Sequence, residues 1–160
     1  MDTTTIVFEI AKMAGTGVVA ATFTAWFTIR DHRFKKWWEL RAAAYQQVIE
    51  ALSDVVYVFS VHFDSELRGV DVSDVKNEKL ASMSNESFAK IRKAADAGAF
   101  LFSDEANALL GDFQKSLDEE HQSYFEHIDG VLFSAKKCLK NLVAQSRKDL
   151  SLHQSFFIWK

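Results

Sequence analysis

Residues 13–41 have the sequence MAGTGVVAATFTAWFTIRDHRFKKWWELR, and this stretch decides the fold. Its first part, residues 13–29, contains no charged side chain, and the apolar character extends back to Ile6 with only two charged residues interrupting it. A helix from Ile6 to the end of this part would be roughly 36 Å long, enough to cross a hydrocarbon core of about 30 Å. The sequence therefore predicts a transmembrane anchor over residues 1–30. A buried core helix of a soluble protein is the alternative, because threonines are interspersed among the apolar side chains.

The second part of the stretch, Arg30 to Arg41, mixes cations with aromatic rings. It carries five Lys or Arg against two acids, a net charge of +3, whereas residues 1–29 carry a net charge of −1. By the positive-inside rule this asymmetry places the basic flank in the cytoplasm and the N-terminus outside. Because the basic residues follow the apolar run, we expect an uncleaved anchor and no signal peptide. A nucleic-acid patch is the weaker alternative, since the cluster is short and adjoins an apolar span.

Tryptophan rings and long cations of this kind are typical of the interface between membrane and water. We therefore predict a basic and aromatic juxtamembrane segment over residues 31–41, with Trp26 also suited to the interface. The predicted interface residues of this region are Arg30, Arg33, Lys35, Lys36, Trp37 and Trp38.

Small residues recur every four positions within the predicted span, at Gly17, Ala21 and Ala25. Such a face lets a second helix approach closely. It predicts self-association through the span, with the alternative that small residues are simply common in spans.

Beyond Arg41 the chain is acidic, with 13 Lys or Arg against 18 Asp or Glu. With 48% hydrophobic and 26% charged residues overall, the 160-residue chain is suited to one folded domain rather than to disorder. No proline occurs anywhere and no glycine lies between Gly17 and Gly69, so we expect one long helix that continues from the span and ends at Gly69. Its seven-residue apolar repeat consists of Trp38, Tyr45, Leu52 and Phe59.

The next segments alternate between irregular and periodic patterns. Residues 70–83 mix polar residues with isolated aliphatics, which favours a flexible connection. Ser84 is a candidate N-cap, and a second amphipathic helix is predicted from Phe88 to Phe102. Ser103, followed by two acids, predicts the start of another helix.

Two apolar stripes follow, over residues 106–117 and 125–142, and a polar interval at residues 118–123 separates them. We expect a turn in this interval, with one continuous helix as the alternative. The predicted fold is all-α: an N-terminal transmembrane helix that continues into a cytoplasmic antiparallel helical bundle of three to four helices over residues 42–150. The remaining tail, residues 151–160, is aromatic and suited to the bilayer interface through Phe156, Phe157 and Trp159, although packing on the bundle or a disordered terminus is equally compatible.

The sequence contains no motif for nucleotide binding, proteolysis or hydrolysis, so we predict no enzyme, no catalytic residue and no cofactor. The single cysteine, Cys138, excludes an internal disulfide and is interpreted as a partly buried structural thiol. His62 is interpreted as a half-buried packing residue. The best metal candidates form one cluster that we interpret as a solvated turn, so no metal site is predicted: Asp118, Glu119, Glu120, His121, Glu126 and His127.

Two segments, WWELRAAAY at residues 37–45 and FLFSDEA at residues 100–106, carry a resemblance. With the preceding span, the chain resembles a loose group of small, largely uncharacterised bacterial membrane-anchored helical-bundle proteins, some from prophage and mobile-element regions. The resemblance extends to about Leu150. It implies the same architecture in a bacterial inner membrane, and it transfers no catalytic residue and no substrate.

The predicted function is a membrane-anchored interaction or scaffold module. Its expected partners are the lipid bilayer and either a second copy or a membrane-associated protein, and neither nucleic acid nor a small-molecule substrate is expected. The alternative is a membrane-perturbing effector, of the phage-defence or lysis type, whose oligomerised span acts on the bilayer.

Overall fold

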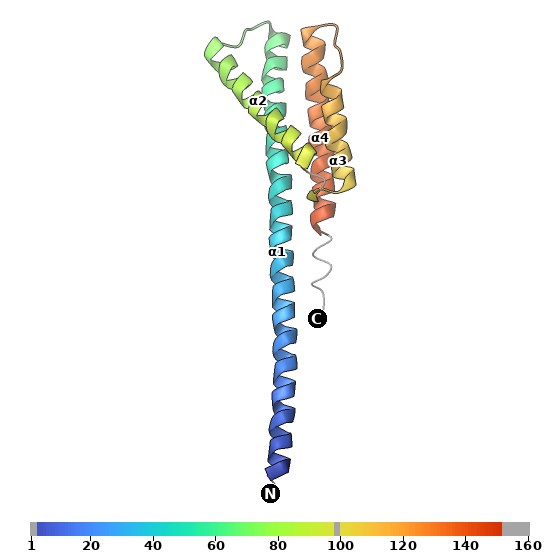
Figure 1. Ribbon diagram of the computed structural model, residues 1–160. Helices are drawn as coiled ribbons and strands as arrows, with labels where there is room; N and C mark the ends of the chain where they lie inside the picture. Colours follow the sequence, from blue (N-terminus) through green and yellow to red (C-terminus); the bar gives the residue numbers. More distant parts are fainter. Residues whose placement is uncertain (1–2, 98–99, 152–160) are drawn as a thin grey trace. The chain divides into compact units, whose positions relative to one another are not determined.

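The computed structural model describes the backbone of residues 3–97 and 100–151, and the side chains at positions 26, 28, 30, 32–96 and 100–151. These residues contain helices and no strand, so the predicted all-α class is confirmed. The chain divides into two compact units, residues 1–39 and 40–160. The helices are α1 (Thr3–Arg68), α2 (Asp74–Ala97), α3 (Asp104–Leu117) and α4 (Tyr124–Ser151) (Figure 1).

Helix α1 is continuous, as predicted, and it ends at Arg68, directly before Gly69. Gly69 has a φ of +61°, a conformation that glycine adopts without strain. Its N–H bonds to the carbonyl of Glu66 at 3.3 Å, and the N–H of Val70 bonds to the carbonyl of Ser65 at 3.2 Å. This pair of bonds is a Schellman motif, which satisfies the last carbonyls of the helix.

The prediction of a flexible connection over residues 70–83 was wrong, because α2 already begins at Asp74. Most side chains of its first turns are exposed and only Leu80 is buried there, so the sequence lacks the apolar period that signals a helix. Ser84 lies inside α2 and caps nothing. Phe102 also lies outside α2, in the junction, where its ring packs edge-on against Tyr45 at 4.8 Å between centroids.

The predicted turn over residues 118–123 is confirmed, and the alternative of one continuous helix is wrong. Ser103 caps α3 as predicted, because its Oγ accepts a hydrogen bond from the N–H of Ala106 at 3.3 Å. Ser123 and Glu126 form a variant of the capping box at the start of α4, in which the Glu126 carboxylate bonds to the residue before the N-cap. The Ser123 Oγ accepts from the N–H of Glu126 at 3.2 Å, and the Glu126 carboxylate accepts from the N–H of Gln122 at 3.1 Å.

All four helices contribute to one apolar core in residues 40–151, and α3 and α4 run antiparallel beside each other (Figure 1). The seven-residue repeat of α1 is buried at Tyr45 and Leu52, half-buried at Phe59 and exposed at Trp38. The most central members of the core are Tyr45, Val48, Leu52, Val55, Ile91, Leu110, Val131 and Leu142.

Within the part of the chain that the structure describes, no helix is both long enough and apolar enough to cross a membrane. The transmembrane character predicted for residues 1–30 stays a prediction.

Candidate functional site

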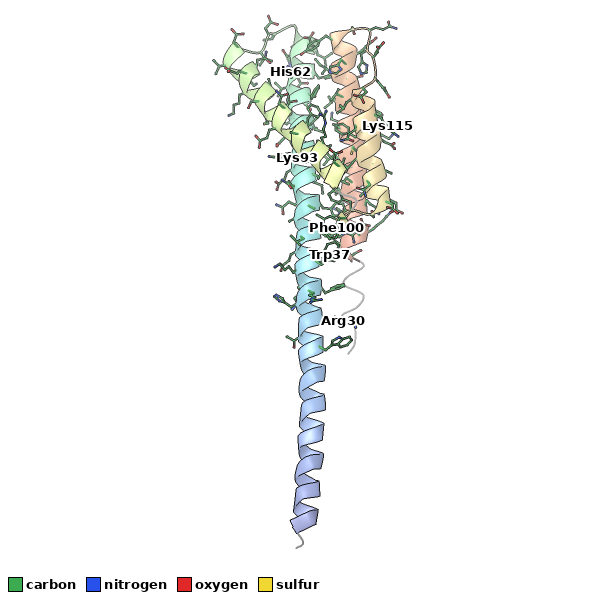
Figure 2. All side chains as sticks on the ribbon, viewed as in Figure 1. Arg30, Trp37, His62, Lys93, Phe100 and Lys115 are labelled. Carbon is green, nitrogen blue, oxygen red and sulfur yellow. The ribbon has the colours of Figure 1, made fainter. Side chains whose placement is uncertain are left out.

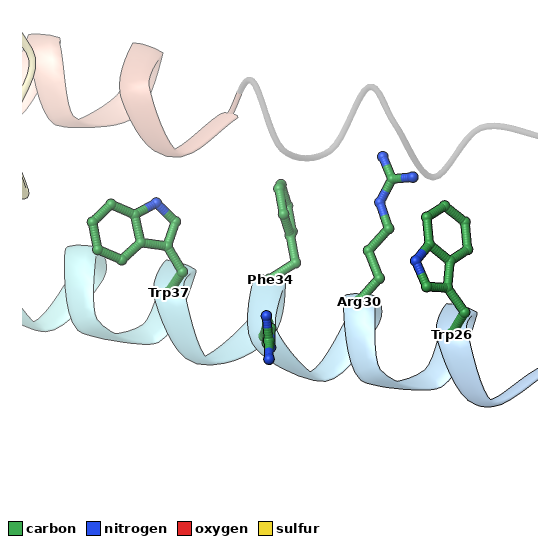
Figure 3. A pocket seen from close by; sticks show the side chains of 5 residues that line it. Trp26, Arg30, Phe34 and Trp37 are labelled. Carbon is green, nitrogen blue, oxygen red and sulfur yellow. The ribbon is translucent and has the colours of Figure 1, made fainter.

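Five side chains of α1 line one shallow hollow of about 660 Å³: Trp26, Arg30, Arg33, Phe34 and Trp37. We name these residues the basic–aromatic face. They lie four, seven, eight and eleven positions after Trp26, so they fall on one side of a helix with 3.6 residues per turn. Figure 3 shows four of them projecting from the same side of α1.

The basic–aromatic face combines planar cations with partly exposed rings. The Arg30 guanidinium carbon lies 5.4 Å from the centroid of the Trp26 ring, which is a cation–π distance. The Trp26 side chain is 56% exposed and that of Phe34 is 46% exposed. Guanidinium groups beside indole rings are suited to a surface that offers both phosphate oxygens and hydrocarbon.

The structure divides the predicted interface residues into two groups. Arg30, Arg33 and Trp37 line the hollow, whereas Lys35, Lys36 and Trp38 are exposed on α1 but do not line it. Phe34 was not predicted to take part. Its signal was its position four residues after Arg30 and eight after Trp26, which places the three side chains in one row along the helix.

Two sets of predicted site residues, the packing face of the span and the aromatic tail, lie outside the side chains that the structure describes. The side chains of Gly17, Ala21 and Ala25 lie outside the described ones, although their backbone belongs to α1. The aromatic tail residues Phe156, Phe157 and Trp159 also lie outside the described residues.

A second group of polar side chains joins α1, the start of α3 and α4, and we name it the Asp149 cluster: Arg41, Tyr45, Ser103, Gln145 and Asp149. The Asp149 carboxylate accepts hydrogen bonds from the Tyr45 hydroxyl, from Gln145 Nε2 at 2.9 Å and from Arg41 Nη2 at 3.3 Å. Gln145 Nε2 also donates to Ser103 Oγ at 3.3 Å. The Asp149 side chain is only 7% exposed, so these donors replace the water that the carboxylate loses.

Burial and hydrogen bonding shift two pKa values in this cluster. Burial raises the pKa of the Asp149 carboxyl, but hydrogen bonds from Tyr45 and Ser103, with the charge of Arg41, outweigh it and hold the pKa below its ordinary value. Burial raises the pKa of the Tyr45 hydroxyl, and the hydrogen bond to Asp149 raises it further. Asp149 is therefore ionised and Tyr45 neutral at pH 7, which suits a structural clasp better than proton transfer.

A hollow of about 590 Å³ opens between the helices of residues 40–151. Its wall contains the apolar side chains of Phe59, Phe88, Ile91, Leu117 and Val131. The polar lining residues are Asn85, Arg92, Asp96, Gln114, Asp118 and His127. Because one guanidinium, two carboxyl groups and one imidazole are mixed there, the lining matches no single class of ligand.

The polar turn before α4 is exposed at Asp118, Glu119, Glu120 and Glu126, as predicted, whereas His121 and His127 are half-buried. The rings of His121 and His127 meet edge-on at 5.3 Å between centroids. A Cβ atom at Gly130 would lie 2.7 Å from Cε1 of His121, so His121 occupies the space that this glycine leaves. Among the side chains that the structure describes, no group of three or more His, Cys, Asp or Glu is arranged to hold a metal ion.

The remaining singled-out residues take part in packing. Cys138 is buried, as predicted, and burial raises the pKa of its thiol to about 12. Its Sγ lies 3.6 Å from the carbonyl oxygen of Leu109 in α3. His62 is half-buried on α1 (Figure 2), which agrees with its interpretation as a packing residue.

Comparison of this chain with protein-family models, with curated proteins and with solved structures finds no match.

Proposed function

We propose that this chain is a membrane-anchored helical interaction module. Its N-terminal helix holds it at a lipid bilayer, with the basic flank on the cytoplasmic side, and its helices in residues 40–151 bind protein, including a second copy of the chain. The observation that carries the proposal is the basic–aromatic face, which begins at Trp26 within the apolar residues 13–29 and continues beyond them.

The chemistry of that face favours the boundary between lipid head groups and hydrocarbon. Indole rings such as those of Trp26 and Trp37 have an apolar body and one N–H donor, and they concentrate at this boundary. A guanidinium group, such as those of Arg30 and Arg33, can donate two parallel hydrogen bonds to two oxygens of one phosphate. The apolar sequence before them is long enough, at roughly 36 Å as a helix, to provide the anchor.

Protein binding is supported by the outward-facing rings of residues 40–151. Phe133, Tyr124 and Tyr57 are 67%, 61% and 53% exposed. Aromatic side chains are enriched in protein–protein interfaces. The pKa values of Tyr45 and Cys138 are raised and that of Asp149 is lowered, all away from neutral pH, which favours binding over proton-transfer chemistry at these groups.

The membrane part of the proposal is tested by expressing the full chain in bacteria and washing the isolated membranes with alkaline carbonate. We expect the protein to stay in the washed membrane pellet, because carbonate releases only peripheral proteins. Recovery in the soluble fraction before the wash would contradict membrane anchoring. Release by the wash would restrict the proposal to peripheral binding and contradict a transmembrane anchor.

The role of the basic–aromatic face is tested with purified protein in vesicles of zwitterionic or anionic phospholipid. We expect Arg30→Gln with Arg33→Gln to reduce the preference for anionic vesicles severalfold. The matched control, Lys93→Gln with Lys115→Gln, changes two exposed cations on α2 and α3 (Figure 2) and should leave that preference unchanged. Equal effects of both pairs would contradict a specific role of the face.

A further inference from the structure

The outer side of α4 carries a row of cations. Residues 130–148 contain five Lys or Arg and no Asp or Glu, although acids outnumber bases in the chain beyond Arg41. All five cations are exposed, and they lie on the side of α4 opposite the buried Val131, Ala135 and Leu142. The row therefore faces solvent and takes no part in the core.

Two contacts define how α3 lies against α4. Cys138 Sγ lies 3.6 Å from the carbonyl oxygen of Leu109, and Gln145 Nε2 donates to Ser103 Oγ at 3.3 Å. Successive residues of a helix turn by about 100°, so three of the cations lie roughly 150–170° around α4 from these contacts. We name these three, which point away from α3, the cationic face: Lys136, Lys140 and Arg147.

Helix α3 presents carboxylates on its own outer side. Asp104 and Asp112 are both exposed, and the small side chain of Ala108, also exposed, lies between them. The three residues are four positions apart, so they form one row along the helix. We name this row, with its two carboxylates, the acidic face.

The cationic and acidic faces match in height along the bundle. Because α3 and α4 are antiparallel and rise by 1.5 Å per residue, the two contacts above place Asp112 within about 2 Å of the height of Lys136. By the same reasoning Lys140 lies at a height between Asp112 and Asp104. Arg147 lies about 5 Å beyond Asp104, within the reach of its long side chain.

We propose that the cationic face of one copy of the chain binds the acidic face of the next copy, with every α1 pointing in the same direction. The copies are related by rotation about an axis parallel to residues 40–68 of α1, which preserves heights along the bundle. Helix α4 runs antiparallel to this part of α1, because Phe125 stacks on Phe63 and Asp149 meets Tyr45. This inference rests on the self-association in the proposed function, and a common direction of α1 is what anchoring in one bilayer requires.

Charge complementarity identifies the occupant. Lys136 of one copy lies at the height of Asp112 of the next, and opposite charges at matching positions favour the correct partner and register. Two α4 helices pointing in the same direction would instead set cations against cations, which is unfavourable. The pairing is head-to-tail, so it forms a ring if the rotation closes. One helix pair buries less than the roughly 800 Å² per partner of a standard interface, so we expect reversible assembly that depends on concentration.

Charge exchange at positions 136 and 112 tests the pairing on full-length protein in detergent. Lys136→Glu should weaken assembly about fivefold, because an attractive pair becomes repulsive. Asp112→Lys should weaken it similarly, whereas the double variant should return it to within about twofold of the unchanged chain. Asp104 is left unchanged because it begins α3 beside the N-cap. The matched control is Lys93→Glu on the exposed surface of α2.

Cross-linking of mixed variants tests the head-to-tail arrangement independently. Ala108→Cys marks the acidic face, and Ala144→Cys marks an exposed position between Lys140 and Arg147. With a bifunctional maleimide each variant alone should form little covalent dimer, because its cysteines lie on the same face of every copy. An equal mixture of the two should cross-link rapidly. The control mixture replaces Ala108→Cys by Ser53→Cys, on the exposed side of α1, and the native Cys138 is only 4% exposed.

The possible outcomes separate this inference from the proposed function. Weakening by each single exchange, recovery in the double variant and cross-linking only in the mixture would support the head-to-tail pairing. Assembly that is insensitive to the exchanges, or rapid cross-linking of either cysteine variant alone, would overturn the pairing while leaving self-association intact. A full-length chain that is monomeric at every concentration would overturn both. Circular dichroism of each variant shows whether the helices are intact.

Discussion

Removal of the Tyr45 hydroxyl should destabilise the fold by about 2 kcal/mol. The hydroxyl donates to the Asp149 carboxylate, and a hydrogen bond to a charged acceptor contributes about 1.5–3 kcal/mol. In Tyr45→Phe the ring keeps its contact with Phe102, so the loss reports the hydroxyl and not the packing. For a folded unit of this size, such a loss lowers Tm by roughly 6–10 °C.

The assay is chemical denaturation of the full chain in detergent, followed by circular dichroism. The matched control is Tyr57→Phe, which removes a hydroxyl from a ring on α1 that is 53% exposed, and its effect should be below about 0.5 kcal/mol. A double-mutant cycle with Asp149→Asn should give a coupling energy of about 1–2 kcal/mol between positions 45 and 149. Equal losses in the two Phe variants, or a coupling near zero, would refute the role given to the Asp149 cluster.

The free energy of unfolding should decrease at acid pH through Asp149 and at alkaline pH through Tyr45. Because the folded pKa of Asp149 lies below its ordinary value of 3.8, its contribution is present above that pH and is lost as the pH falls through the folded pKa. Because the folded pKa of Tyr45 lies above 10.0, its contribution is present below pH 10 and is lost as the pH rises through the folded pKa. Asp149→Asn should therefore flatten the acid side of the profile, and Tyr45→Phe the alkaline side.

Three further predictions concern single positions. Gly69→Ala should lower the free energy of unfolding by about 1 kcal/mol, because alanine is strained at a φ of +61°. No atom lies within 4 Å of the added Cβ, so the effect reports the backbone alone, and an unchanged denaturation midpoint would contradict it. Ser103→Ala should cost about 1–2 kcal/mol, since the Ala106 N–H and Gln145 Nε2 both lose the Ser103 oxygen as acceptor. A loss no larger than that of Ser53→Ala on the exposed side of α1 would contradict the role of these contacts. Cys138, with a pKa raised from 9.0 to about 12, should form about a thousandfold less thiolate at pH 8 than an ordinary thiol, so labelling by a maleimide should require denaturant; rapid labelling of the native chain would contradict its burial.

The long helices and their ends were predictable from local patterns. The absence of helix breakers and a seven-residue repeat predicted one long helix up to Gly69. The structure shows that α1 ends there, because Gly69 has a positive φ. The N-cap at Ser103 was equally predictable, because a serine before two acids is itself the physical cause of the helix start.

The first half of helix α2 was missed, because its first turns are largely exposed. Only Leu80 is buried there. Prediction from hydrophobic periodicity needs a row of buried apolar residues, and these turns have none. A local signal was overlooked at α4, where Ser123 and Glu126 have the spacing of a capping box.

Whether the contacts at the candidate surfaces could be predicted depends on how far apart their residues lie in the sequence. Asp149 meets Tyr45 and Arg41 across 104 and 108 residues, and no local pattern indicates which distant donors a carboxylate will find. The basic–aromatic face spans about three turns of one helix, so its members could be placed from spacing alone. Phe133 required the structure, because only the observed burial of its neighbours shows that it points away from the core.

The central claim, a self-associating helical module held at a membrane, is tested most directly by the mass of the full-length chain in detergent. Light scattering with the detergent contribution subtracted should give at least twice the chain mass of 18.2 kDa, with a fraction that rises with protein concentration. A mass of one chain at every concentration would contradict the claim.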